Sequence, residues 1–330
     1  MFRRPVRSDG PLHVLFVVPD LTVGGAERHV ATLLPAMDRT RFAPSVLCIN
    51  QPGPLFAEVE AAGVPARALD HPKANVLGLV CALVELVVHL LRTRPDVVVM
   101  RGANAELLGR IAAVLARVPR TVVWVHNCGE VTPRPRARTL ADRLLGPVTS
   151  AYYGLARGQV PYLVDELGYE RSKIRLVHNG ADPARYPFVP VEERSRALAE
   201  ELGVQPGDAV VGIVAVLRPE KDHTTFLRAA RTVLERVPHA RFLVVGRGKY
   251  PEDMERVQAQ ARELGIADRV VFTGRRADVA DVVALMDVFC LTSYTVECFP
   301  MALLEAMAVG RAAVCTAVAS SSAIGKHSTV

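Results

Sequence analysis

The feature that most constrains the fold of this chain is a regular alternation of short apolar segments with longer amphipathic ones. The apolar segments include HVLFVVP at 13–19, DVVVM at 96–100 and TVVWVH at 121–126. Runs this uniformly apolar are typical of parallel strands that are covered on both faces. Because segments with helical periodicity lie between them, the sequence predicts an α/β fold with doubly wound parallel sheets.

The alternation is interrupted once, between residues 181 and 205. This stretch is polar and contains Pro183, Pro187 and Pro190. A chain of 330 residues, 50% of them hydrophobic, can form two cores. We therefore expect a first Rossmann-like domain at 1–188, a linker at 189–207 and a second Rossmann-like domain at 208–330. The expected helices are 25–37, 55–62, 76–92, 105–117, 160–167, 224–236, 252–264, 279–286 and 300–309.

Composition narrows the functional class. The formal net charge is +6, mostly from arginines spread along the chain, with a dense cluster PRPRAR at 133–138. This cluster is interpreted as a solvated loop, or alternatively as a patch that faces anionic lipid or a phosphorylated acceptor. Aromatic residues are few and no nucleic-acid motif is present, which disfavours nucleic-acid binding.

The cysteines and apolar runs indicate a cytoplasmic location. The six cysteines form no C-x-x-C pair, so we expect reduced, buried thiols and no disulfide or zinc framework. The basic N-terminus lacks a small-residue cleavage site. The longest apolar run, 76–91, contains Glu85 and His89 and is too short to span a bilayer, so it predicts a buried helix.

The segment SYTVECFPMALLEAMAVG, at 293–310, contains the most informative motif. Pro300 suits the first turn of a helix, where its missing N–H has no cost. Glu297 then lies in the loop before that helix, and Glu305 lies on its second turn. A helix N-terminus favours phosphate, and carboxylates beside it can accept hydrogen bonds from sugar hydroxyls. Two glutamates at this spacing would more often be ordinary surface residues. The whole string of residues around them favours a ligand-binding role instead.

The pattern Glu297-x7-Glu305 with Phe299-Pro300 and LLEAMA resembles the donor-site signature of the retaining GT-B glycosyltransferases of family 4. This resemblance extends over roughly residues 12–318. It implies two Rossmann-like domains that face each other across a cleft, the first on the acceptor side and the second binding a nucleotide sugar. It implies that Glu305 holds the ribose hydroxyls, and that Glu297 with the backbone at Cys298 and Phe299 holds the donor sugar.

Other positions carry roles through the same resemblance. Gly24 and Gly25, in GGAER, are similar to a loop near the donor phosphates and the acceptor. His126 ends an apolar strand and is expected to orient the sugar and acceptor at the reacting centre. Lys221 stands where the family has a phosphate-binding lysine. Gly246 and Arg275 match turns that border the nucleotide; Ser293 matches a small residue before the two-glutamate motif.

The sequence departs from the family pattern in three places. Val216 stands where an arginine is common, leaving Arg218 as the nearest basic alternative for the donor diphosphate. Cys298 replaces the commoner glycine between Glu297 and Phe299. The chain ends in ASSSAIGKHSTV, where the family would continue with Gly-Gly and further elements. Five strands are expected in the second domain, where about six is usual, so we expect this domain to be truncated and its last strand partly uncovered.

The expected function is transfer of a sugar from a UDP- or GDP-sugar to a glycan or lipid-linked acceptor, with retention of configuration. No metal site is expected, because no Asp-x-Asp and no His/Cys ligand cluster occurs. No cofactor is expected either; the nucleotide sugar is a substrate. The expected location is the cytoplasm, with peripheral contact at the inner face of the membrane as the sharper interpretation. Two alternatives stay open, a GT-B nucleotide-sugar epimerase and an impaired remnant that binds nucleotide sugar weakly or not at all.

Overall fold

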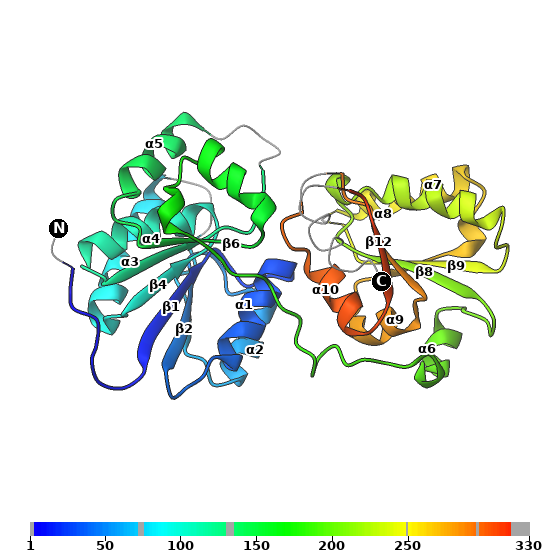
Figure 1. Ribbon diagram of the computed structural model, residues 1–330, viewed down its shortest axis with the longest axis horizontal. Helices are drawn as coiled ribbons and strands as arrows, with labels where there is room; N and C mark the ends of the chain where they lie inside the picture. Colours follow the sequence, from blue (N-terminus) through cyan, green and yellow to red (C-terminus); the bar gives the residue numbers. More distant parts are fainter. Residues whose placement is uncertain (1–2, 72–75, 130–134, 249, 295–296, 318–330) are drawn as a thin grey trace. The chain divides into compact units, whose positions relative to one another are not determined.

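The computed structural model describes residues 3–71, 76–129, 135–248, 250–294 and 297–317. The chain divides into two compact units, Met1–Asn179 and Gly180–Val330 (Figure 1). The division precedes the expected linker, because residues 180–207 pack on the second unit. Tyr186, Leu198 and Leu202 belong to its core. Helix α6 (Arg196–Glu201) lies inside the expected linker and is capped by the Ser195 hydroxyl, which accepts from the Leu198 N–H at 3.2 Å.

Unit 1 contains a parallel sheet in the order β3-β2-β1-β4-β5-β6-β7. Its strands are β1 (Leu12–Val18), β2 (Phe42–Cys48), β3 (Ala66–Ala68), β4 (Val97–Met100), β5 (Arg120–Trp124), β6 (Ala151–Gly154) and β7 (Ile174–Leu176). Its helices are α1 (Gly25–Ala36), α2 (Pro54–Ala61), α3 (Val76–Thr93), α4 (Ala103–Leu115) and α5 (Arg136–Leu145). Strand order reverses between β1 and β4, which makes this position the topological switch point of the sheet.

The helices of unit 1 cover both faces of its sheet (Figure 1). Because crossovers between parallel strands are right-handed, α1 and α2 cover one face, and α3, α4 and α5 cover the other. One core cluster joins Leu86 of α3 and Leu108 of α4 to Val98 and Met100 of β4. The central strands β1 and β4 thus find cover on two sides, which is the reason that their sequences are uniformly apolar.

Four details of unit 1 differ from the sequence-based expectations. Residues 136–138, expected in a loop, begin α5, and β6 was not expected at all. The expected helix at 160–167 is a π-helix at Tyr162–Glu166. Helix α3, expected to be buried, buries only one side. Leu77, Val80, Val84, Val88 and Leu91 on its other side are exposed.

Unit 2 contains a five-stranded parallel sheet in the order β10-β9-β8-β11-β12 over the residues that the structure describes. Its strands are β8 (Ala209–Val214), β9 (Ala240–Val245), β10 (Val270–Gly274), β11 (Val288–Leu291) and β12 (Ala312–Cys315). Its other helices are α7 (His223–Leu234), α8 (Pro251–Glu263), α9 (Val279–Leu285) and α10 (Met301–Ala308). The strand order reverses between β8 and β11, so the switch point lies there.

The last strand and the cysteines bear on two further expectations. Ala312, Ala313 and Val314 of β12, an edge strand within the described residues, are exposed. The expected altered tail at 318–330 lies outside those residues, so truncation of this domain stays a prediction. Cys48, Cys81, Cys290 and Cys315 carry free thiols, and Cys81 is exposed because it lies on the outer side of α3. Cys128 and Cys298 are not among the free thiols. No helix within the described ranges is both long enough and apolar enough to cross a bilayer.

Candidate functional site

The loops that carry the second-domain site residues leave the carboxyl ends of neighbouring strands of unit 2. Residues 215–221 follow β8, residues 246–248 follow β9, Arg275 follows β10, and residues 292–300 follow β11. In a parallel sheet these ends meet at one edge, and ligands bind where the strand order reverses. Lys221 follows β8 and Glu297 follows β11, so the two residues flank the switch point.

A charged cluster occupies that switch point. The Lys221 ammonium donates a short hydrogen bond to Glu297 Oε1, and both side chains are largely sheltered from solvent. The Ser293 hydroxyl donates to the same carboxylate oxygen at 2.7 Å. Ser293 itself is fully buried. The structure therefore brings together three residues that the sequence analysis singled out separately, and it pairs the expected phosphate ligand with the expected sugar ligand.

Backbone contacts hold these two loops against each other. The Thr292 hydroxyl donates to the carbonyls of Lys221 and Asp222, at 3.1 and 2.9 Å. The Tyr294 N–H donates to the Glu220 carbonyl at 3.2 Å. Asp222 adopts a left-handed conformation, with φ of 45°, and caps α7 by accepting from the Thr225 N–H at 3.1 Å. Lys221 is thereby fixed at the end of a tight turn that points it toward Glu297.

Glu305 lies on α10 and is 8% exposed. It forms a hydrogen bond with the hydroxyl of Tyr186. Burial, followed by the proximity of Glu305, raises the pKa of Tyr186 to about 12, so this phenol stays protonated and can donate to the carboxylate. The sequence analysis did not find Tyr186, because it lies before the expected linker and belongs to no motif.

The remaining expected donor residues fall at the same edge with different degrees of exposure. Gly246 has φ of 143°, and a Cβ there would lie 1.9 Å from the Ala215 carbonyl oxygen, so the close approach of two loops requires glycine. Arg218 and Arg275 are exposed. Cys298 is buried and Phe299 is half-buried at the start of the turn that leads into α10.

The first βα turn of unit 1 places a second ion pair at that unit's switch point. Gly24 precedes α1 in extended conformation, and Gly25 is the first residue of the helix. Glu27 accepts from Arg101 at 2.5 Å. Arg101 follows β4, so the pair joins the loops after β1 and β4. Neither Glu27 nor Arg101 was singled out from the sequence. The position of Arg101 directly after an apolar strand could have marked it as a residue of the carboxyl edge.

His126 lies beside this pair, just after β5. Its ring packs against those of Trp124 and His29, with centroids 4.8 and 6.2 Å away. Its Nδ1 lies 3.4 Å from the Trp124 carbonyl oxygen, and its buried Nε2 has no partner among the described residues. Burial, with smaller contributions from Arg101 and His29, lowers the pKa of His126 to about 3. His126 is therefore neutral at physiological pH and can offer Nε2 to a substrate hydroxyl.

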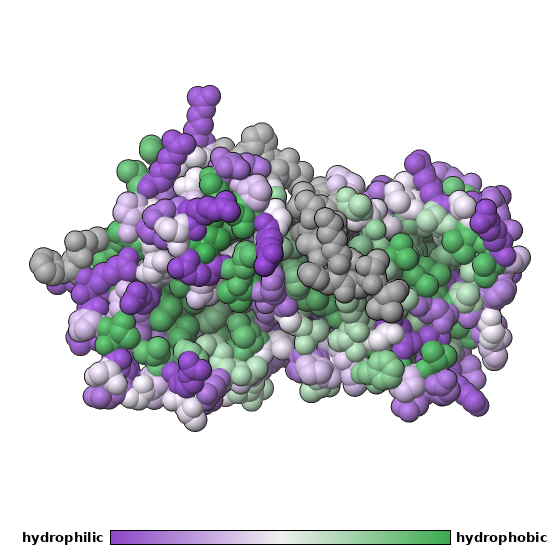
Figure 2. Space-filling model, in the orientation of Figure 1, coloured by the Kyte–Doolittle hydropathy of each residue, from purple (hydrophilic) through white to green (hydrophobic). Residues whose placement is uncertain are grey.

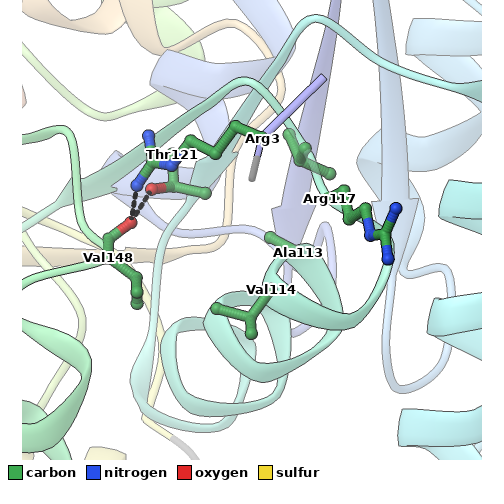
Figure 3. Close-up of a pocket in the computed structure, with 7 residues that line it drawn as sticks. Arg3, Ala113, Val114, Arg117, Thr121 and Val148 are labelled. Carbon is green, nitrogen blue, oxygen red and sulfur yellow. Dashed lines mark hydrogen bonds between the residues drawn. The ribbon is translucent and has the colours of Figure 1, made fainter. Parts of the chain in front are cut away.

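The small cavity of unit 1 lies at the opposite edge of the sheet. It has a volume of about 10 Å³, close to that of one water molecule. Figure 3 shows that Arg3 and Thr121 both donate to the Val148 carbonyl there, with 2.7 Å for the threonine. Thr121 lies at the amino end of β5 and Val148 lies before β6, whereas ligand sites of such sheets follow the strands. In the described ranges, no group of three His, Cys, Asp or Glu side chains is placed to hold a metal ion.

Comparison with known proteins bears on both units. Residues 23–185 match the model for Glycosyltransferase Family 4, and residues 208–329 match that for Glycosyl transferases group 1. A UDP-Gal:alpha-D-GlcNAc-diphosphoundecaprenol alpha-1,3-galactosyltransferase of Escherichia coli is 27% identical over 69% of this chain and 59% of its own length. A D-inositol 3-phosphate glycosyltransferase of Nocardia farcinica is 30% identical over 59% of this chain and 44% of its own. The chain thus matches about half the length of these relatives.

Solved structures share the fold. The Anabaena protein Alr3699/HepE in complex with UDP superposes with a TM-score of 0.80, at 21% identity over 95% of this chain and 83% of its own. A glycosyltransferase of Rickettsia africae gives 0.79 at 15% identity, over 94% and 80%. A UDP-N-acetylglucosamine 2-epimerase also superposes, with 0.59 at 16% identity over 92% and 78%. The fold alone therefore does not separate transferases from epimerases.

Both matched family models describe glycosyltransferases, so they favour a transferase over an epimerase where the fold does not. Together the two matches extend over both units. The switch-point cluster of unit 2 lies within one matched segment, and the loops around His126 lie within the other. The two matches follow each other in the order of the two sheets. This chain belongs to the family 4 (group 1) glycosyltransferases and has their GT-B fold of two Rossmann-like α/β units.

Proposed function

We propose that this chain transfers a sugar from a nucleoside diphosphate sugar, with uracil or guanine as the base, to a glycan or lipid-linked acceptor. The observation that carries the proposal is the cluster of Lys221, Glu297 and Ser293 at the switch point of unit 2, with the buried Glu305 on the helix that follows. One cation, two carboxylates and a helix N-terminus supply the groups needed for a diphosphate, a ribose and a sugar.

The residues then take separate roles in donor binding. Glu305, already bonded to the Tyr186 hydroxyl, accepts hydrogen bonds from the ribose. Glu297 and the backbone at Cys298 and Phe299 hold the donor sugar. Lys221, with Arg218 beside it in sequence, stabilises the diphosphate as negative charge develops on it. Lys221 is bonded to Glu297 in the structure, and its ammonium has further N–H groups that can donate to the diphosphate.

The reaction follows from these roles without a metal ion. The acceptor oxygen forms a bond to the anomeric carbon as the bond from that carbon to the diphosphate oxygen breaks. Attack from the leaving-group side retains the configuration, and the acceptor proton passes to the departing phosphate. His126 contributes a neutral imidazole that orients the sugar and the acceptor hydroxyl. A lipid-linked acceptor would present its headgroup at a bilayer, so the proposal includes peripheral contact with an anionic membrane at its inner face.

Calorimetry with UDP and with GDP tests the donor site. We expect one of the two to bind, and Glu305→Ala to weaken that binding about 10- to 100-fold, the equivalent of a charge-assisted contact. Glu255→Ala, an exposed carboxylate of α8 in the same unit, is the matched control and should leave affinity unchanged. Equal affinities of wild type and Glu305→Ala would remove Glu305 from the nucleotide site.

A second candidate is an impaired protein that binds nucleotide sugar without transferring it. The observations that favour it are Val216 in place of the usual arginine and the engagement of Lys221 by Glu297. Turnover of radiolabelled nucleotide sugars separates the two candidates. Nucleotide binding without release of labelled product, across a panel of donors and acceptors, would establish the second candidate.

A further inference from the structure

Helix α3 carries an apolar stripe on the side that points away from its sheet. Leu77, Val80, Val84, Val88 and Leu91 have exposed fractions of 70%, 51%, 57%, 38% and 52%. They are three or four positions apart, so they form one line along the helix. Between Leu77 and Leu91 this line extends for about 21 Å at the usual helical rise.

The stripe is not needed for the fold, because the opposite side of α3 already fills the core. Ala82, Leu86 and Leu90 are almost completely buried there. Helix α8 of unit 2 shows the ordinary arrangement, with a buried side at Val257 and Ala261. The exposed positions of α8 that carry charge are Glu252, Glu255, Arg256, Arg262 and Glu263. Exposed apolar residues gathered in this way mark a surface that docks on something.

The apolar surface continues over the helices next to α3. Leu115 at the end of α4 is 58% exposed, and Leu140 and Leu144 of α5 are 58% and 70% exposed. All three helices cover the same face of the sheet. Figure 2 shows green apolar residues beside purple charged ones at the place that α5 occupies in Figure 1. The exposed Arg136 and Arg143 of α5 supply part of that charge.

Arginines gather where α3 ends. The N-terminal segment lies across the amino ends of β4 and β5, because Arg4 donates to the Pro95 carbonyl at 2.9 Å and Arg3 to the Pro119 carbonyl at 2.9 Å. Two turns that follow α3 and α4 lie beside it. We call the arginines of these segments the basic end: Arg3, Arg4, Arg7, Arg92, Arg94, Arg117 and Arg120.

The basic end holds little compensating negative charge. All its arginines except Arg4 are exposed. The acids of the same segments are Asp9 and the buried Asp96, which pairs with Arg7. Partial burial, followed by the neighbouring Arg120, lowers the pKa of Arg3. Arg3, Arg120 and Lys173 also line a shared hollow. Positive charge this dense needs an anionic partner.

We propose that the outer face of α3 and the adjoining basic end form a docking surface for a bilayer that contains anionic lipids. The apolar stripe enters the boundary between headgroups and acyl chains, and the arginines beside its carboxyl end contact lipid phosphates. An apolar helix face with cations at its margin has the composition of an interfacial membrane helix. The acid on this helix, Glu85, is bonded to His71 at 2.9 Å and lies 3.9 Å from the guanidinium of Arg67, which partly compensates its charge.

A second copy of this chain that docks through the same surface is a poorer partner. It would bring the same arginines together, so the basic end would stay uncompensated. A bilayer with anionic lipids supplies both an apolar layer and negative charge. This inference rests on the proposed function for the membrane contact and locates the surface that makes it. None of its residues belongs to the carboxyl edge of either sheet, so it can fail without a failure of the donor site.

Cosedimentation of the full chain with vesicles tests the proposal. We expect binding to vesicles of phosphatidylcholine with phosphatidylglycerol, and at least about tenfold weaker partition into phosphatidylcholine alone. Val84→Asp with Val88→Asp should abolish binding to both. Arg92→Gln with Arg120→Gln should weaken binding to the anionic vesicles about tenfold or more and leave the weak binding to neutral vesicles unchanged.

Matched variants in unit 2 control for general effects. Val191→Asp with Val314→Asp introduces the same charges at exposed valines, and Arg228→Gln with Arg236→Gln removes the same charges from exposed arginines. Both should bind vesicles like wild type. Circular dichroism checks that every variant is folded. Nucleotide affinity, measured by calorimetry, should be equal in all of them, so a failure of the donor-site proposal is seen separately.

Two results would overturn the proposal. Vesicle binding that is unaffected by the α3 substitutions would show that the stripe is not the docking surface. A lipid-free dimer in sedimentation velocity that dissociates in the Val84→Asp/Val88→Asp variant, with no binding of wild type to vesicles, would make the stripe a contact between copies of this chain.

Discussion

The ion pair in the interior of unit 1 and the ion pair at the edge of unit 2 differ in their access to solvent. In unit 1, Arg110 and Asp142 are fully buried as a bonded pair. Unit 2 keeps its main pair, Lys221 and Glu297, partly open to solvent at the carboxyl edge of the sheet. An enclosed pair is fixed in one arrangement, whereas a pair at an edge can exchange partners. The comparison predicts that the edge pair of unit 2 exchanges partners more readily than the interior pair of unit 1.

The buried pair of unit 1 gives the largest expected effect. Asp142 accepts hydrogen bonds from Arg110 and, at 3.4 Å, from Arg138. Asp142→Ala leaves the Arg110 charge buried and unpaired, so we expect the free energy of unfolding to fall by about 3–5 kcal/mol. Urea unfolding monitored by circular dichroism measures it. Asp268→Ala, an exposed aspartate of unit 2, should cost less than about 0.5 kcal/mol; similar losses for both would break the comparison.

The next effect concerns catalysis at the edge of unit 1. His126→Ala should lower kcat about 100-fold once an active donor and acceptor are known, because the imidazole orients the reacting groups. Nucleotide affinity should be unchanged, since the nucleotide residues lie in unit 2. His89→Ala removes a half-buried histidine of the same unit away from this edge and serves as control. Full kcat in the His126 variant would show that the residue is structural.

Lys221 tests the exchangeable pair of unit 2. Lys221→Met should weaken binding of the nucleoside diphosphate about 10- to 100-fold, through loss of a charge-assisted contact. Glu297→Gln should weaken binding of the nucleotide sugar and leave the nucleoside diphosphate alone unaffected. Lys173→Met in unit 1 is the control. Tighter diphosphate binding after Glu297→Gln would mean that the ion pair itself limits access to Lys221.

The last test concerns the pH dependence of stability. Burial lowers the pKa values of His29 and His126 in unit 1 to about 4 and about 3, and that of His223 in unit 2 to about 4. In the unfolded chain these groups take up protons near pH 6.5, so their contribution is present above that pH and is lost as pH falls toward about 4. Each contributes on the order of 1 kcal/mol per pH unit in that window.

Trp124 makes this pH effect specific to unit 1. It is the single tryptophan of the chain and packs against both His29 and His126. We expect the urea midpoint of its fluorescence to fall between about pH 6.5 and about pH 5, and His126→Phe to reduce that fall. A midpoint that is independent of pH would contradict the neutral, enclosed state of these histidines.

Much of the architecture could be predicted because it follows from local patterns. Uniformly apolar segments gave the strands, and helical periodicity gave helices such as α1, α7 and α8 within a few residues. Strand β6 and helix α5 could not be found in this way. The strand AYYG is short, and α5 has apolar residues on its exposed side, so neither has the usual pattern. The π-helix at 162–166 has helical periodicity, but its backbone geometry depends on packing.

The candidate site, like the fold, was predicted in part from local sequence and depends in part on tertiary contacts. The sequence by itself determined the residue types and their order: the two glutamates, Lys221 and the histidine after an apolar strand, with roles that are still proposals. Only the tertiary structure decided that Lys221 and Glu297 bond to each other, that Tyr186 joins Glu305, and that Arg101 pairs with Glu27. Only the tertiary structure showed that one side of α3 is exposed to solvent. These facts depend on which strands are neighbours and on which helix face has a layer over it, and both are set by contacts between residues far apart in the chain.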